Sequence, residues 1–213
     1  TNLPQGKASV GDIEVGDVDQ DGDLDMLLAD WGDESPVSIS GGGVTLLWRQ
    51  MDKPANWGEQ TTGMFEDVTL AQMPNVSVRW SWDAEFVDVD NDYDLDILVS
   101  AFAGDKASVL LFINDGAGSF KDATAGNMAQ GKNALDVEPM DLNGDSFLDL
   151  VTLRDGQSGR NRVLINNKLG GFTDATDLVW RKLENPTSLD FTGAFYDYNS
   201  DKRVDLVLGA LQT

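Results

Sequence analysis

The 213-residue chain contains no cysteine and no histidine. Their absence excludes disulfide bonds, zinc sites of the usual ligand types, and nucleophilic triads that use histidine as the base. No apolar run approaches the ~20 residues that a membrane-spanning helix requires. The chain has only 15 basic residues and 37 acidic ones, which gives a net charge of −22. This balance argues against a nucleic-acid partner, because binding to phosphates depends on Lys and Arg.

The acidic residues gather in one recurring pattern. The segment "DVDQDGDLD" at 17–25 (loop one) places an aspartate at every second position and runs directly into an apolar stretch. Crowded carboxylates raise the cost of ionising one another. Calcium offsets this cost, because it takes about 6–8 oxygen ligands from such loops. The loop is not an EF-hand, because its twelfth position is Leu28 and its flanks have the pattern of strands.

Three further copies of this loop follow. They are "DVDNDYDLD" at 88–96 (loop two), "DLNGDSFLD" at 141–149 (loop three) and "DYNSDKRVD" at 197–205 (loop four). Each has Asp at positions one, five and nine, Asp or Asn at position three, and an apolar strand afterwards. The four loops hold 16 of the 37 acidic residues. The acidity therefore belongs mostly to a repeated site, not to an acidic tail.

The repeats also match outside the loops. A strand precedes each loop and another follows it. A further strand is predicted at 44–50, 108–115 and 161–167, and the next opens with an aromatic residue and ends in Asp-x-Thr, as in "SFKDAT". Four short strands in each unit of roughly 55 residues predict the blade of a β-propeller.

The motifs "FVDVDNDYDLDILV" and "INDGAGSFKDAT" resemble the FG-GAP, or VCBS-type, repeats of integrin-like β-propellers. The resemblance extends over roughly residues 8–211. It implies an all-β fold, a β-propeller or propeller segment of four-stranded blades, with a calcium loop between the first and second strands of each blade. About three and a half repeats form one domain, 1–213, and they span approximately 8–78, 79–131, 132–184 and 185–213, the last being incomplete.

The resemblance further implies up to four bound calcium ions. Side-chain oxygens at positions one, three, five and nine, and the backbone carbonyl at position seven, would be the ligands. For loops one and two these are Asp17, Asp19, Asp21, Asp23, Asp25, Asp88, Asp90, Asp92, Asp94 and Asp96. For loops three and four they are Asp141, Asn143, Asp145, Phe147, Asp149, Asp197, Asn199, Asp201, Arg203 and Asp205.

The loops depart from this pattern in ways that rank them. Only loop one has glycine at position six, and Tyr93, Ser146 and Lys202 there make a positive φ less favourable. Loops three and four replace one carboxylate with asparagine, and loop four adds two basic residues. We expect loops one and two to bind calcium best and loop four worst. The alternative for loop four is a turn stabilised by its own side chains, without an ion.

Three and a half blades do not close a ring, and open sheet edges leave N–H and C=O groups unpaired. Three explanations compete: the chain is part of a longer one, a second chain completes the ring, or the sheets form an open stack with covered ends. We favour the first two, in which a missing segment or a second chain completes the propeller.

The sequence contains no recognisable catalytic constellation, so we expect no enzyme activity. The first expectation is a calcium-stabilised module for protein recognition or adhesion, located outside the cell, at its surface or in the periplasm, where calcium is abundant. One alternative is a non-catalytic segment of a larger secreted enzyme or multi-subunit assembly. Another is a lectin-like module that binds glycans through Trp31 and Trp57 in the loops 31–43 and 49–63, although these side chains could instead cover a sheet edge.

Overall fold

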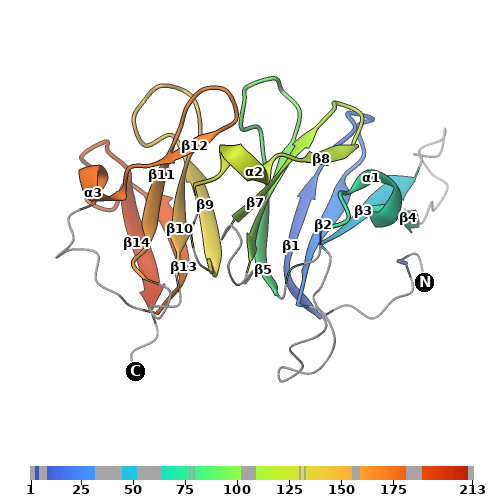
Figure 1. Ribbon diagram of the computed structural model, residues 1–213, viewed down its shortest axis with the longest axis horizontal. Helices are drawn as coiled ribbons and strands as arrows, with labels where there is room; N and C mark the ends of the chain where they lie inside the picture. Colours follow the sequence, from blue (N-terminus) through green and yellow to red (C-terminus); the bar gives the residue numbers. More distant parts are fainter. Residues whose placement is uncertain are drawn as a thin grey trace.

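Three four-stranded antiparallel sheets and one two-stranded sheet make up the described part of the computed structural model. The structure describes residues 3–4, 9–31, 45–51, 64–76, 78, 80–101, 109–129, 131, 133–154, 159–180 and 189–210. Figure 1 shows the sheets next to one another in chain order. The expectation of an all-β chain built from four-stranded sheets is confirmed.

Each sheet is a simple meander, and we call the sheets blades one to four. Blade one contains β1 (Val10–Gly16), β2 (Asp25–Asp30), β3 (Leu46–Met51) and β4 (Met64–Asp67). Blade two contains β5 (Ser81–Val87), β6 (Asp96–Ala101), β7 (Val109–Asn114) and β8 (Phe120–Asp122). Blade three contains β9 (Asp136–Met140), β10 (Asp149–Leu153), β11 (Arg162–Asn166) and β12 (Phe172–Asp174). Blade four contains β13 (Asp190–Tyr196) and β14 (Asp205–Ala210).

A helical turn follows blades one and three, and a turn with non-helical backbone angles at Ala125 and Gly126 follows blade two. The sequence pattern did not predict these turns. These turns are α1 (Thr69–Gln72), α2 (Thr124–Asn127) and α3 (Thr176–Val179). The Asp-x-Thr motif ends the strand and starts the turn: in blade two, the Thr124 N–H donates to Asp122 Oδ1 at 2.9 Å, and the Thr124 hydroxyl accepts the Leu111 N–H at 3.0 Å. The motif therefore fastens the turn to the third strand. None of the described helices is long and apolar enough to span a membrane.

The hydrophobic core lies between the blades. The layer between blades one and two contains Val18, Leu27 and Leu47 from one side and Ile97 and Phe112 from the other. Similar layers join blades two and three, and blades three and four. In all three complete blades the second strand is mostly buried, because it lies inside the sheet between the first and third strands. Burial of this apolar surface holds the stack together.

The first strands of successive blades are joined by one repeated hydrogen bond. An aspartate five residues before each of loops one, two and three accepts a backbone N–H from the first strand of the next blade. The Val137 N–H donates to Asp83 Oδ2 and the Gly193 N–H to Asp136 Oδ2, both at 2.9 Å, and the Ala84 N–H lies 3.4 Å from Asp12 Oδ2. These bonds set the spacing of neighbouring blades.

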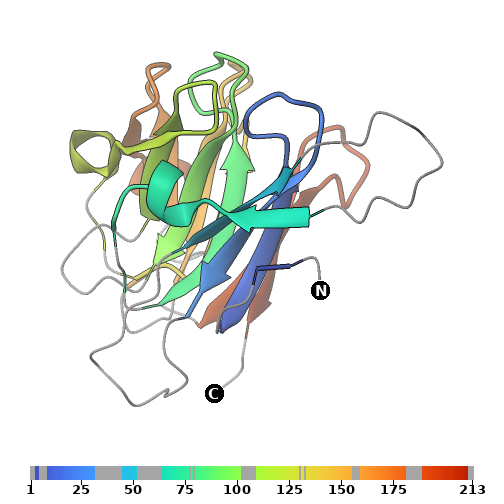
Figure 2. The same cartoon turned by 90° about the vertical axis from the view of Figure 1, so that its right-hand side faces the viewer.

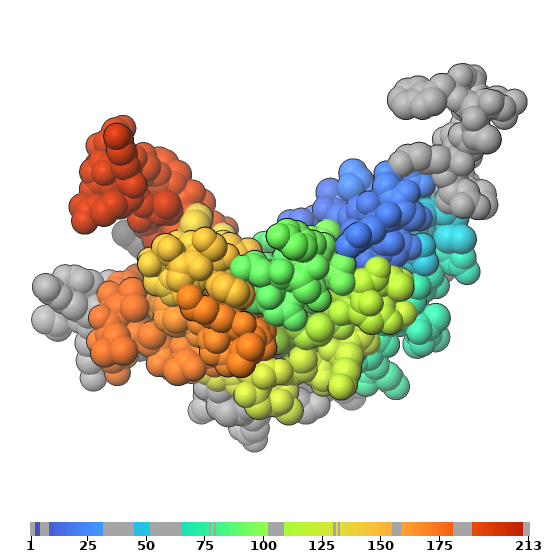
Figure 3. All heavy atoms as spheres, turned by 90° about the horizontal axis from the view of Figure 1, so that it is seen from above, coloured from blue at the N-terminus to red at the C-terminus, as the bar shows by residue number. Residues whose placement is uncertain are grey.

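The described residues form an open arc and not a closed ring. Seen from above in Figure 3, blade four (red) and blade one (blue) lie on either side of a hollow. Figure 2, turned by 90°, shows the sheets stacked one behind another with their strands steeply inclined. Both terminal faces of the stack therefore lack a neighbouring blade among the described residues.

Candidate metal sites

All four loops are shaped by the same backbone hydrogen bonds. In loop two, the Asp92 N–H donates to Asp88 Oδ1 at 3.2 Å and the Tyr93 N–H to Asp88 Oδ2 at 3.0 Å. The Asp94 N–H donates to Asp92 Oδ1 at 2.9 Å. The equivalent bonds recur in the other loops at Asp17, Asp21, Asp141, Asp145, Asp197 and Asp201. The carboxylates at positions one and five are thus held in place by the chain itself.

Two residues of every loop have a positive φ. At position six, φ is 88° for Gly22, 74° for Tyr93, 70° for Ser146 and 67° for Lys202. Position four is likewise left-handed in all four loops, with φ between 58° and 76°. The lack of glycine at position six therefore does not change the turn. Each non-glycine residue in this conformation costs about 1–2 kcal/mol, which the loop's hydrogen bonds offset.

The aspartate at position nine joins the loop to the sheet. Asp96 is buried, and it accepts the Val89 N–H at 3.1 Å and the Asn114 N–H at 2.9 Å. Burial raises the pKa of this carboxyl to about 7. Asp25 and Asp149 make the equivalent pairs of bonds, and burial raises their pKa values as well. A nearby cation would favour the charged form of these buried carboxyls.

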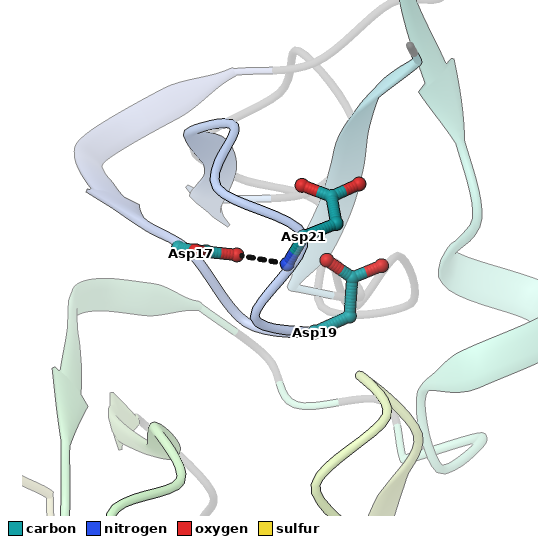
Figure 4. Close-up of side chains that lie close together, drawn as sticks. All are labelled: Asp17, Asp19 and Asp21. Atoms are coloured by element: carbon teal, nitrogen blue, oxygen red, sulfur yellow. Dashed lines mark hydrogen bonds between the residues drawn. The ribbon is translucent and has the colours of Figure 1, made fainter.

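Loops one and two bring three carboxylates together. One oxygen each of Asp17, Asp19 and Asp21 lies within 4.8 Å of the others. Figure 4 shows these three side chains around the turn of loop one. The equivalent group in loop two consists of Asp88, Asp90 and Asp96. The other eight predicted side-chain ligands of loops three and four form no such group of three carboxylates among the described residues.

Asp90 provides the test of whether these residues fit calcium. Its Oδ1 is buried and accepts no hydrogen bond from any residue that the structure describes. Burial, followed by the charges of Asp92 and Asp88, raises the pKa of this carboxyl. A buried acceptor without a partner is costly. A hard cation bound by Asp88, Asp90 and Asp96 would satisfy this oxygen, so the donor set of loop two fits calcium.

In the other three loops, a basic side chain forms an ion pair with a loop carboxylate. Arg49 of β3 forms ion pairs with Asp19 and, at 3.7 Å, with Asp21 of loop one. Lys168 lies 3.1 Å from Asp145 in loop three, and Arg203 lies 2.6 Å from Asp201 in loop four. Within the part of the chain that the structure describes, no carboxylate of loop two has such a partner. Loop two therefore offers a cation the least competition.

Sequence reasoning identified the basic residues of loop four but missed Arg49 and Lys168. Arg49 precedes Gln50, whose N–H donates to Asp25 Oδ1, and in blades two and three the equivalent positions hold Ile113 and Ile165. An arginine in place of isoleucine at the end of the third strand is the signal that could have identified it. Only the strand register shows that this position lies beside the loop.

The remaining predicted ligands have local roles. Asn143 Oδ1 accepts the Asp145 N–H at 2.9 Å, and Asn199 Oδ1 accepts the Asp201 N–H at 2.8 Å. At position seven, the N–H groups of Asp23, Asp94, Phe147 and Arg203 donate to the aspartate at position five. These hydrogen bonds shape the turn in all four loops.

Side-chain hydrogen bonds connect loops one and two to the next blade, and no sequence pattern predicted them. Gln20 Nε2 donates to Asp94 Oδ1 at 2.5 Å, and Asn91 Nδ2 donates to the Ser146 carbonyl at 3.0 Å. Asn114 Nδ2 donates to the Val18 carbonyl, and Asn166 Nδ2 to the Val89 carbonyl, both at 2.8 Å. The asparagine near the end of the third strand in blades two and three thus binds the loop of the preceding blade.

Trp31 packs on blade one. Its ring centroid lies 4.8 Å from that of Trp82, and it covers Gly11, where an added Cβ would clash with the indole. Trp82 in turn lies 6.1 Å from Trp80. Trp57, and most of the two long loops of the first repeat, lie outside the described residues.

Comparison with known proteins adds one match. A family model described as an FG-GAP-like repeat matches residues 100–152 and 141–208, which together cover about half of the chain. A search of curated proteins gave no match. The matched segments include loops three and four and the strands on both sides of them.

Proposed function

Because the chain belongs to the family of FG-GAP-like repeat proteins, we propose that it is a β-propeller module whose loops bind calcium and whose role is to recognise another protein, as in adhesion. The observation that carries the calcium assignment is loop two, where three carboxylates converge and Asp90 Oδ1 is buried without a hydrogen bond. Loop one is the second site, with Arg49 as a competing cation.

The role of the ions in this proposal is structural. Each loop carries two left-handed residues, and loops one and two also accept a hydrogen bond from the third strand of the next blade. A cation that binds the folded loop contributes its binding free energy to folding. Loops of this kind that bind calcium weakly are filled only where calcium is abundant, so we place the protein outside the cytosol: extracellular, at the cell surface or in the periplasm.

We also propose that the module is not itself an enzyme. Most of the loop carboxylates accept backbone N–H groups, which leaves them little freedom to act on a substrate. The alternative is a non-catalytic propeller segment of a larger secreted enzyme or assembly. An apolar cavity of about 310 Å³ favours completion by further strands: Val151 and Val163 of blade three line one side, and Phe195 and Leu206 of blade four the other.

Blade two indicates what this cavity accepts. Its third strand contributes Leu110 and Phe112 to the layer against blade one. Blade four has no third strand among the described residues, and the cavity lies where such a strand would pack. We propose that further blade-like strands, from a second chain or another segment, cover it.

The calcium proposal predicts a melting temperature that depends on the ion. One site at a hundredfold excess of calcium over its Kd stabilises the fold by about 2.7 kcal/mol, which corresponds to about 5–10 °C in a domain of this size. Chelation should remove this gain. Asp92→Ala should remove part of it, because Asp92 shapes loop two and carries one of its charges.

Glu66→Ala is the matched control, since it removes an exposed carboxylate of β4 outside the loops. It should leave the calcium-dependent shift unchanged. A melting curve that is the same with calcium and with chelator would overturn the proposal.

A further inference from the structure

A polar cavity of about 400 Å³ lies in blade three, at the end of the sheet opposite loop three. β10 leaves the loop at Asp149 and reaches the cavity at Arg154. Arg160 and Arg162 line it as well, so three of the chain's 15 basic residues gather within nine positions of a protein with a net charge of −22. This concentration of guanidinium groups sets the cavity apart from the acidic loops.

The arginines depart from the repeat. Arg162 pairs with Thr152 in the sheet, whereas the equivalent pairs are Leu28 with Leu46 in blade one and Val99 with Leu110 in blade two. Two blades thus form the same layer with apolar side chains. Packing of the blade does not require an arginine here, so its presence needs a local reason.

The guanidinium groups differ in how well they are satisfied. Arg162 Nε and Nη2 both donate to Asp174 Oδ2, at 3.0 and 2.7 Å. Arg160 Nη2 donates to Asp177 Oδ1 at 2.6 Å, but its Nη1 is buried and has no acceptor among the described residues. Asp177 is 81% exposed, and an ion pair with so exposed a carboxylate is weak and easily exchanged. Arg162 thus has a fixed partner, whereas Arg160 has donor capacity left over.

We propose that this cavity binds the oxyanion of a small polar ligand, a carboxylate or a sulfate, through Arg160. The anion accepts from the buried Nη1 and competes with Asp177 for the rest of the guanidinium, whose planar fork suits two-oxygen recognition. The cavity lies at the lower end of the range for small-molecule sites, and it suits a ligand of about the size of one sugar ring. The site goes beyond the proposed function and does not depend on calcium.

Titration calorimetry on the full chain tests this at constant ionic strength, with glucuronate as the carboxylate probe, inorganic sulfate as the sulfate probe, and glucose as the neutral control. We expect saturable binding of at least one anion and none of glucose. Binding of only one anion identifies which oxyanion geometry the cavity accepts. Arg160→Gln should weaken binding about tenfold, because it removes a charge-assisted hydrogen bond.

Two further variants separate the site from general electrostatics. Asp177→Asn should strengthen anion binding, since it removes the competing carboxylate, and its exposed position makes a folding defect implausible. Lys121→Gln makes the same charge change as Arg160→Gln on exposed β8 and should leave binding unchanged. The proposal fails if neither anion binds saturably, if Lys121→Gln weakens binding as much as Arg160→Gln, or if Asp177→Asn does not strengthen it. None of these results bears on the chelation experiment.

Discussion

At the scale of single residues, the aspartates at different positions of a loop have different roles. Those at positions one, five and nine accept backbone N–H groups, so the turn needs them whether or not an ion is bound. Position three is the one that varies, with Asp in loops one and two and Asn in the others. In loop two it carries the unpartnered oxygen. If the loops bind calcium as we propose, position three is where the four loops differ most in the side-chain oxygens they offer the ion.

Tyr93 permits a test of backbone strain in loop two. It is exposed and has a φ of 74°. Tyr93→Gly removes a left-handed penalty of about 1–2 kcal/mol but adds about 0.5–1 kcal/mol of unfolded-state entropy. We expect a net gain of about 0.5–1 kcal/mol in the free energy of unfolding, measured by urea denaturation in saturating calcium.

Gly22 occupies the same position in loop one and serves as the reciprocal variant. Gly22→Ala should lower the free energy of unfolding by about 1 kcal/mol, because alanine at φ 88° is strained. Opposite signs for the two variants would support the assignment of position six as left-handed. A loss of stability in Tyr93→Gly would contradict it.

At the scale of elements, periodic strands and turn residues predicted the three complete sheets well, because every blade repeats the same signals. The short turns after β4, β8 and β12 escaped prediction, since four residues are too few to show a period. The Asp-x-Thr motif that starts them was visible but was assigned to the strand end. Contacts such as Asn166 with Val89, 77 positions apart, depend on how blades stack, and no local pattern contains them.

The first strands carry a second set of carboxylates, three residues before each loop. Glu14, Glu85 and Glu138 occupy this position in blades one to three, and Ala194 does so in blade four. The pKa of Glu85 is raised to about 8, first by burial and then by the charges of its neighbours on the adjoining first strands: Glu14, Glu138, Asp12 and Asp136. Burial likewise raises the pKa of Glu138 to about 7.

This arrangement predicts a stability that falls as pH rises. A carboxyl whose pKa is higher in the folded state holds its proton more tightly there, so its contribution is complete below about pH 4.5 and is lost as the pH passes 8. The Gln side chain of Glu85→Gln cannot ionise. The parent should therefore lose about 1–2 kcal/mol more of its free energy of unfolding across this pH range than the variant does, after allowance for solvent screening.

Urea unfolding of both proteins at the two ends of this range, in saturating calcium, measures the effect. Glu66→Gln, on exposed β4, is the control and should follow the parent. If Glu85→Gln and the parent lose stability in parallel, the first-strand carboxylates are not the cause.

At the scale of the whole molecule, the two ends of the arc expose the two kinds of sheet face that pack against each other between neighbouring blades. Ile13, Val15 and Leu24 on blade one are each about half exposed. Their equivalents in blade two are Ala84, Phe86 and Leu95, of which Ala84 and Phe86 belong to the layer against blade one. At the far end, Tyr196, Tyr198 and Val207 of blade four are also exposed.

Exposed faces of this kind predict association. Sedimentation velocity over a range of concentrations should show the chain forming larger species. The double variant Ile13→Lys with Val15→Lys should reduce this, because charge on an uncovered sheet blocks docking. Leu70→Lys, on exposed α1, is the matched control and should associate as the parent does. A parent that remains monomeric throughout would show that these faces need no cover.

The hydrogen bonds that run from loop to loop have a consequence for how the protein responds to its surroundings. Gln20 ties loop one to loop two, and Asn91 ties loop two to loop three. Ordering one turn lowers the entropy cost of ordering the next. We therefore expect calcium to bind first at loop two and then at the loops on either side of it. If the loops bind calcium in this coupled way, the arc should become rigid over a narrower range of calcium concentration than it would if each loop bound independently.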